Sequence, residues 1–235
     1  MKNFVYLLIT ANQIDKGVVT AIKELSLLKL CEEVANPQQL KIVQKGSFLK
    51  EEEQNNRLVY IVKSGLFRIG VEYQQSTLPL SYIIPGESVG LMGLLQAINR
   101  PCYFEAVIRS EVYYLDYSHI KDLIVLEPEL ALAIKKHQSR LIIVLMERIK
   151  SLVFYSPFQR LVSWIAEYNR NKTFKEMRLW ALLTADDMAA YCHMETSEFL
   201  GYLNELSRLG AITIEKHDCH VNDWGKLNQF LQTTK

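Results

Sequence analysis

The stretch LTADDMAAYCHMETSEFLGYLNELSRLGAITIEKHDCHV, residues Leu183–Val221, has the clearest local pattern in the chain. Thr184 stands three residues before Asp187, which is the spacing of a capping box with Asp in place of the usual Glu or Gln. We therefore expect a short helix to begin here. Residues 192–194 then turn the chain, and a second helix is expected to begin around 195–196.

The second helix and the residues after it complete a known motif. The apolar residues of this helix recur at helical spacing: Phe199, Leu203 and Leu206. Gly210 is a good residue to end it, and two short strands are expected over 211–214 and 219–221. This order is typical of a winged helix-turn-helix, which places its second helix in the major groove of DNA. A helical hairpin with no nucleic-acid role is the alternative.

The middle of the chain has a sequence pattern typical of β-strands. Short runs rich in β-branched and aromatic residues alternate with turn residues, as in an antiparallel barrel or jelly roll. The runs are 40–43, 58–62, 67–71, 78–84, 103–108 and 112–115. Residues 1–35 instead show helical periodicity, which Asn36 and Pro37 end.

A long helix is expected over 128–154, with Pro128 in its first turn. An apolar stripe follows this helix at spacings of three, four and seven: Ile134, Leu141, Leu145, Ile149 and Leu152. Such a stripe can pack on the chain's own barrel, or it can form a coiled-coil seam with a second copy. We favour the seam, because the helix is longer than a small barrel would cover.

Composition narrows the class of protein. The chain has 235 residues, 49% hydrophobic residues and a net charge of +1, which excludes a disordered chain, a uniformly basic nucleic-acid coat and a polybasic membrane binder. The apolar runs at 4–9 and 141–146 are far shorter than the ~20 residues that span a bilayer. Four separated cysteines without a CxxC pair fit a reducing compartment, so a cytoplasmic protein is expected.

The chain shows no pattern typical of an enzyme. A nucleophile–base–acid set, a GxxxxGK[ST] loop and an HExxH helix are all missing from the sequence. Cys192 and His193 in the turn, with the run HDCH at 217–220, are good transition-metal ligands. Alternate residues of a strand point to opposite faces, so this set is split and a metal site is not expected.

Nearly the whole chain resembles the Crp/Fnr family of bacterial transcription regulators. The run LVYIVKSG at 58–65 resembles the strand-turn signature of the family's barrel. The run PGESVGLMGLL at 85–95 resembles the loop and helix that cradle a nucleotide phosphate. Residues Ser151–Phe154 followed by Arg160 resemble the junction after the dimer helix, and Leu183–Ile214 resemble the DNA-binding unit.

The resemblance implies an effector site in the cradle, although not one for cyclic AMP. In members that bind cyclic AMP, an acid holds the ribose and an Arg-Ser pair holds the phosphate. Here Leu91 and Arg100-Pro101 stand at those places. The expected site residues are Gly86, Glu87, Gly90, Leu91, Met92, Arg100 and Pro101. An anionic or largely apolar effector is expected, with Arg100 as its anchor or as a solvated turn residue. An iron–sulfur cluster is not expected, since an N-terminal cysteine cluster is missing.

The resemblance also assigns the DNA contact. Thr196, Ser197 and Gly201 take the base-reading positions, while Glu195 or Glu198 can accept from cytosine. Residues 184–222 hold two basic and seven acidic residues (2 − 7 = −5), which opposes binding to phosphates. Flanking cations are expected to compensate, or they form a solvated face. The expected DNA contacts are Thr184, Glu195, Thr196, Ser197, Glu198, Gly201, Arg160, Lys172, Lys175, Arg178 and Lys216.

These expectations describe an α+β protein with an antiparallel β jelly-roll effector domain over 1–127, a dimerisation helix over 128–154 and a winged helix-turn-helix over 155–235. The resemblance implies a homodimer that binds a palindromic operator in double-stranded DNA and is controlled allosterically at the barrel. RNA polymerase is a candidate further partner, and a membrane is not. The alternative function is a ligand- or protein-binding module whose winged helix has lost duplex binding.

Overall fold

The structure is a computed structural model that describes residues 39–50, 52–53, 56–74, 76–91, 102–126 and 128–232. The expected helices of residues 1–35 lie outside this part of the chain. So do three of the expected effector-site residues, Met92, Arg100 and Pro101.

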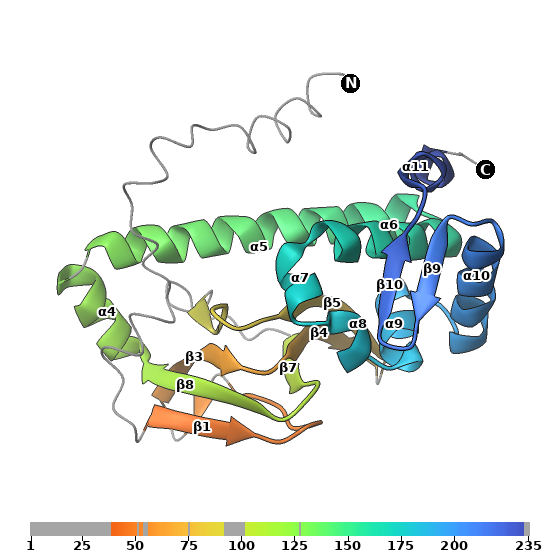
Figure 1. Cartoon of the computed structure of the whole chain (residues 1–235). Helices are drawn as coiled ribbons and strands as arrows, with labels where there is room; N and C mark the ends of the chain where they lie inside the picture. The colour runs from red at the N-terminus through yellow and green to blue at the C-terminus, as the bar shows by residue number, and fades with distance from the viewer. Residues whose placement is uncertain are drawn as a thin grey trace.

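The jelly roll expected from the sequence is present as two antiparallel sheets (Figure 1). The first sheet has the order β1-β8-β3-β2, with β6 paired to β3, and the second has the order β5-β4-β7. The strands are β1 (Leu40–Val43), β2 (Glu52–Glu53), β3 (Asn56–Ser64), β4 (Phe67–Tyr73), β5 (Ser76–Ile83), β6 (Ser88–Val89), β7 (Cys102–Ala106) and β8 (Ser110–Asp116). Alternate residues of these strands point inward, and Tyr60, Val62 and Phe67 are fully buried between the sheets.

Helices follow the barrel. They are α4 (Tyr117–Leu126), α5 (Pro128–Phe154), α6 (Pro157–Arg170), α7 (Lys172–Glu176), α8 (Leu179–Leu182), α9 (Ala185–Cys192), α10 (Thr196–Arg208) and α11 (Trp224–Gln232). The wing is the antiparallel pair β9 (Ile212–Glu215) and β10 (Asp218–Val221). The α+β class and the winged helix-turn-helix expected from the sequence are therefore correct.

The helix α5 presents a different face outward from the one the sequence analysis favours. Ile134 is only 6% exposed and packs with Leu130 on the chain's own barrel, so its assignment to a dimer seam is wrong. Leu141 and Leu145 are half-buried and line a cavity under the helix. The physical reason is that the barrel covers the side of α5 on which Ile134, Leu141 and Leu145 lie.

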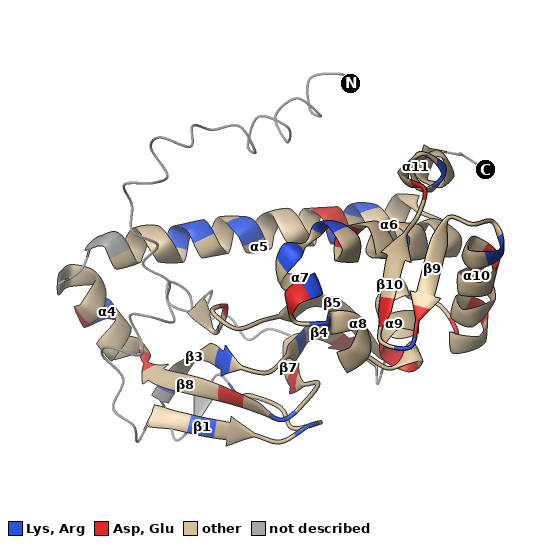
Figure 2. Ribbon diagram, in the orientation of Figure 1, with Lys and Arg blue, Asp and Glu red and all other residues tan. Residues whose placement is uncertain are grey.

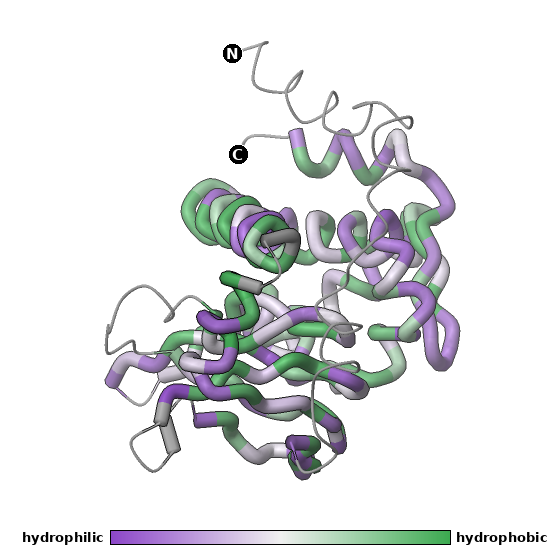
Figure 3. Tube along the Cα trace, turned by 90° about the vertical axis from the view of Figure 1, so that its left-hand side faces the viewer, coloured by the Kyte–Doolittle hydropathy of each residue, from purple (hydrophilic) through white to green (hydrophobic). Residues whose placement is uncertain are grey.

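A second apolar stripe lies on the opposite, open side of α5. Its members are more than half exposed and follow one another at spacings of four, three and four: Ile142, Met146, Ile149 and Val153. We call these four residues the outer stripe. Of the predicted seam, only Ile149 belongs to it, while Leu152 is half-buried. Figure 3 shows α5 nearly along its axis, with apolar residues on the side turned away from the barrel.

A tight corner links α5 to the winged helix. Ser156 caps α6 and forms a complete capping box with Gln159, because each side chain bonds the other's backbone N–H. Pro157 fills the first turn of α6, where a missing N–H costs nothing. The chain thus leaves α5 and enters α6 within two residues, which fixes how the C-terminal helices start.

The C-terminal helices pack on the barrel as well as on one another. One continuous apolar cluster joins Leu66, Tyr82 and Ile84 of the barrel region to Trp164 and Leu206 of the winged helix. The helix α9 contacts β5 directly, and the two elements are seen together in Figure 1. Within the residues that the structure describes, no helix is both long enough and apolar enough to cross a bilayer.

Candidate nucleic-acid interface and effector cavity

The turn between α9 and α10 is built as the sequence predicts. Thr184 accepts a hydrogen bond from the Asp187 N–H at 3.1 Å, and the Asp187 carboxylate accepts from the Thr184 N–H at 3.0 Å. His193 ends α9 in the left-handed conformation (φ 52°), which turns the chain sharply into α10. Phe199, Leu203 and Leu206 are buried beneath α10, so the opposite face of that helix must face outward.

The outward face of α10 carries the predicted base-reading residues. Ser197 and Gly201 are exposed, and an added Cβ at Gly201 would meet nothing within 4 Å. Two neighbours are instead engaged within the unit. The Thr196 hydroxyl donates to Asp186 at 2.6 Å, and Glu198 accepts from the Tyr202 hydroxyl at 2.9 Å. Ser197 and Gly201 therefore have the least obstructed positions for contact with a base edge.

The acidic charge of the unit is smaller in three dimensions than in the sequence. Arg68 of β4 pairs with Asp187 at 2.8 Å, and Lys175 of α7 pairs with Asp218 at 2.9 Å. Both cations come from outside 184–222. Arg68 also pairs with Glu105 of β7 at 2.7 Å, so adding both cations and this carboxylate to the sequence count gives 2 + 2 − 8 = −4 in place of −5. This lowers the electrostatic opposition to DNA without removing it.

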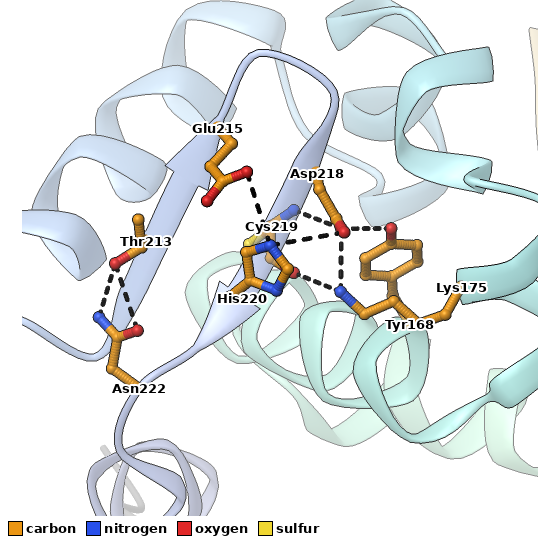
Figure 4. A network of polar contacts seen from close by, with 8 residues as sticks. All are labelled: Tyr168, Lys175, Thr213, Glu215, Asp218, Cys219, His220 and Asn222. Atoms are coloured by element: carbon orange, nitrogen blue, oxygen red, sulfur yellow. Dashed lines mark hydrogen bonds and ion pairs between the residues drawn. The ribbon is translucent and has the colours of Figure 1, made fainter.

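Lys175 is already engaged, which corrects its assignment as a phosphate contact. Its ammonium donates to the Asp218 carboxylate and to the Cys219 carbonyl, both at 2.9 Å. The Tyr168 hydroxyl donates to the same carboxylate (Figure 4). Partial burial alone would raise the pKa of Asp218, but these hydrogen bonds outweigh it and hold the pKa below its usual value. Lys175 thus anchors the wing to α6 and α7.

Arg160 is the second correction. Its guanidinium donates to the carbonyls of Cys192 (2.7 Å), Tyr155 (3.0 Å) and His193 (2.9 Å). These carbonyls lie at the end of α9 and at the end of α5, where no helical partner is available to accept for them. Arg160 is therefore a structural link between the two helix ends, with three of its five N–H groups donating to these carbonyls.

Other predicted cations are exposed. Lys172 is 88% exposed at its side chain and forms only a surface pair with Glu176 at 3.4 Å. Arg178 and Lys216 are also exposed, the latter in the hairpin of the wing. Figure 2 shows the wing hairpin and α7 carrying both signs of charge, with acidic residues along α9 and α10. Lys172, Arg178 and Lys216 thus have exposed side chains, and their contact with phosphate stays a prediction.

The histidines and cysteines of the turn and wing do not converge. Cys192 and Cys219 are buried, and burial raises the pKa of each thiol to about 12, so both remain protonated at neutral pH. His220 instead lies 3.5 Å from Asp218. Among the described residues, no three His, Cys, Asp or Glu side chains lie close enough together to hold a metal ion.

The cradle loop is folded tightly against the barrel. Gly90 has φ +93°, and a Cβ there would lie 2.6 Å from the Leu58 carbonyl oxygen. Leu91 is 3% exposed and belongs to the core cluster under α5. Burial raises the pKa of Glu87, and the hydrogen bond from the Ile84 N–H and the nearby charge of Arg140 offset this in part. The carboxylate of Glu87 is therefore occupied by its own loop and helix.

A cavity of about 160 Å³ lies beneath α5. Its walls come from strands β4, β5 and β7, from the loop at 87–91, from α5, and from the corner between α6 and α7, where Asn171 and Phe174 contribute. The lining is mainly apolar, with the Ser88 hydroxyl buried and without a hydrogen-bond partner among the described residues. Burial and the nearby charge of Arg140 lower the pKa of His137, so this imidazole is neutral at pH 7.

Three residues that sequence reasoning did not identify connect the cavity region to the winged helix: Arg68, Tyr82 and Arg148. Arg148 is a buried cation, and charged side chains are rarely buried unless they have partners. In the sequence, its position within the apolar periodicity of α5 was the one feature that could have indicated its burial. The partner of Arg68 lies 119 residues away, and no sequence pattern marks such a pair.

Comparisons with known proteins agree with this architecture. The family profile described as cyclic nucleotide-binding domain matches residues 40–126. The cAMP-activated global transcriptional regulator CRP of Salmonella typhimurium is 24% identical over 111 residues, which is 47% of this chain. The matched region spans about half (53%) of that relative's own length.

Solved structures extend the likeness over more of the chain. A CooA mutant from Carboxydothermus hydrogenoformans aligns with a TM-score of 0.71 at 17% identity, over 88% of this chain and 96% of that one. A Crp/Fnr family transcriptional regulator from Thermus thermophilus aligns with a TM-score of 0.60 at 18% identity, over 83% and 98%. At these identities the likeness establishes a shared fold. The predicted resemblance is thus confirmed: the chain carries the cyclic nucleotide-binding domain and has the fold of the Crp/Fnr family.

Proposed function

We propose that this chain is a homodimeric, sequence-specific DNA-binding transcription regulator of the Crp/Fnr type. The observation that carries the proposal is the open face of α10. This helix stands between a capped α9 and a two-stranded wing, and it exposes Ser197, Gly201 and Leu200. In a winged helix-turn-helix the second helix enters the major groove, so this face is the one that meets base edges.

Specificity and affinity come from different residues. Ser197 can exchange hydrogen bonds with a base edge, and the missing side chain of Gly201 lets the backbone approach closely. Lys172, Arg178 and Lys216 supply the phosphate contacts. With so few cations and a residual acidic excess, binding to DNA is expected to depend only weakly on salt for a protein of this fold.

The outer stripe of α5 forms the dimer interface. Its four apolar side chains have the spacing of a coiled-coil seam and are uncovered in the isolated chain. A parallel pair of α5 helices would bury them and place two winged helices side by side. A two-fold dimer then matches a palindromic operator, with RNA polymerase as a further partner to be tested, in the cytoplasm of the cell.

The cavity beneath α5 is the effector site, and its ligand is small and largely apolar. Leu91 has no acceptor for a ribose hydroxyl, and the carboxylate of Glu87 already has a partner in its own loop. The unpartnered Ser88 hydroxyl supplies one polar contact for the ligand. Titration calorimetry should therefore show no saturable heat with cyclic AMP, and micromolar binding would contradict this assignment.

Selection from random duplexes tests the whole proposal. The full chain should enrich a palindrome with half-sites about 10 base pairs apart at low salt, with cell extract added in parallel to supply an effector. Ser197→Ala should change the preferred bases, whereas a Lys172→Gln variant should bind every sequence less tightly. If no sequence is enriched under either condition, the chain is a ligand- or protein-binding module.

A further inference from the structure

The barrel and the winged helix of one chain are joined by a defined set of contacts, which we call the latch. It consists of Arg68 and Tyr82 on the barrel, Arg148 on α5, and Asp187 and Tyr191 on α9. The contact lies between elements distant in the sequence, since β4 and α9 are separated by more than a hundred residues. Its chemistry is mixed, with one ion pair, one ring stack and one buried cation.

Arg68 joins the two units with a forked contact. One guanidinium nitrogen donates to Asp187 of α9 at 2.8 Å, and another donates to Glu105 of β7 at 2.7 Å. Burial alone would lower the pKa of Arg68, but the hydrogen bond and charge of Glu105 and the charge of Asp187 raise it above its usual value. One cation therefore binds the barrel and the first helix of the DNA-binding unit together.

Arg148 links a third element, α5, to both β5 and α9. Its side chain is buried and donates to the Pro79 carbonyl of β5 at 3.0 and 3.3 Å and to the Tyr191 carbonyl of α9. The guanidinium also lies 4.4 Å from the centroid of the Tyr191 ring. The position of α9 on the barrel therefore depends on α5 staying close to β5.

Tyr82 belongs to both the latch and the cavity. Its ring stacks on Tyr191 with centroids 5.5 Å apart, and the same residue lines the cavity beneath α5. The Tyr82 hydroxyl and the Arg68 Nε are buried without a hydrogen-bond partner among the described residues. Unpaired buried polar atoms are costly, so the latch is a contact whose closed state is not fully satisfied.

We propose that the latch holds the winged helix on the barrel in a closed arrangement and that filling the cavity opens it. The cavity separates β5 from α5, and Arg148 must bridge these two elements to reach Tyr191. A molecule wedged between them pushes α5 outward, lengthens the Arg148–Pro79 contact and displaces Tyr82 from Tyr191. This rests on the proposed function only in assigning an effector to the cavity.

Cys192 and Cys219 report opening in the unmodified chain. Cys192 is 1% exposed and follows Tyr191 at the end of α9, next to Arg148. Cys219 is fully buried in the wing, so we expect a reagent to reach it only when the winged helix itself unfolds. Pulsed labelling with a thiol reagent, read by mass spectrometry of each peptide, therefore separates opening of the latch from global unfolding.

The variants are matched in pairs. Arg68→Gln should raise the labelling rate of Cys192 roughly 10- to 150-fold, the effect of one lost charge-assisted hydrogen bond, with no change at Cys219. Lys63→Gln removes a different barrel ion pair, with Glu111 at 3.3 Å, and should change neither rate. Tyr82→Phe removes an unpartnered hydroxyl and keeps the ring, so it should slow the labelling of Cys192.

The role of the cavity is tested with a larger side chain that fills it, because the ligand is unidentified. Leu145→Trp fills the cavity from α5 and should accelerate labelling of Cys192 alone, whereas Lys136→Trp on the exposed surface of α5 should not. The proposal is overturned if Arg68→Gln leaves Cys192 unchanged, if Cys192 and Cys219 accelerate by the same factor, or if Leu145→Trp has no effect. These readings need no DNA, so they stand apart from the duplex-selection experiment.

Discussion

Placing a charge at Ile149 should abolish the dimer while leaving the fold intact. Ile149 is 61% exposed in the isolated chain, and full burial of an Ile side chain is worth about 1.5–3 kcal/mol. About three fifths of that is recovered on dimerisation, or about 1–2 kcal/mol for each copy and 2–4 kcal/mol for the pair. Ile149→Glu loses this and also brings two carboxylates into an apolar seam.

The expected result is a dimer dissociation constant raised by at least about 30- to 700-fold, which corresponds to 2–4 kcal/mol. Sedimentation velocity over a range of concentrations measures this, and the thermal midpoint of the monomer should change little because the side chain is exposed. Lys136→Glu, on the exposed surface outside the stripe, should remain dimeric. An Ile149→Glu protein that sediments as the wild type would show that the outer stripe is not the dimer interface.

Three further predictions test the site. Wild type should be more stable than Asp218→Asn at pH 7, because the pKa of Asp218 is lowered in the folded state. Thermal scans should show this difference in stability shrinking as the pH falls through about 3.9, the pKa of Asp in the unfolded chain. The difference should be lost below the pKa that Asp218 has in the folded state. Gly90→Ala should lower the urea midpoint more than Gly86→Ala, because both have positive φ but only a Cβ at position 90 meets backbone; equal effects would contradict this. Arg160→Gln should lower the thermal midpoint by stranding its carbonyl partners. Arg178→Gln should leave the thermal midpoint unchanged, weaken binding to all DNA sequences alike and reduce the salt slope by about 1.

The sequence predicts those parts of the fold that local chemistry specifies. The capping box at Thr184, the turn at His193 and the helix end at Gly210 depend on contacts between neighbours in the chain, and each appears where expected. The strands of the barrel follow from alternation and turn residues in the same way. Such features need no knowledge of how distant elements pack, which is why periodicity and caps were sufficient for them.

The face of α5 could not be predicted in this way. Ile134 and Ile149 both fit an apolar periodicity, and only the position of the barrel decides that the first is covered and the second open. The same holds for the cations. Lys175 and Arg160 look available in the sequence, but the acceptors that bind them come from the wing and from helix ends far along the chain. A side chain's partner, unlike its helix, is a property of the tertiary fold.

The helix α5 takes part in the cavity, in the proposed dimer interface and in the latch. Its inner side lines the cavity, its outer stripe is the expected dimer surface, and Arg148 near its end holds α9 on β5. A shift of α5 away from β5 would therefore alter the cavity, the seam and the latch together, because all three lie on one rigid helix of 27 residues. Coupling of this kind does not require a chain of side-chain rearrangements between sites. It requires that α5 have two positions and that a ligand prefer one of them, which is the condition for any allosteric effect.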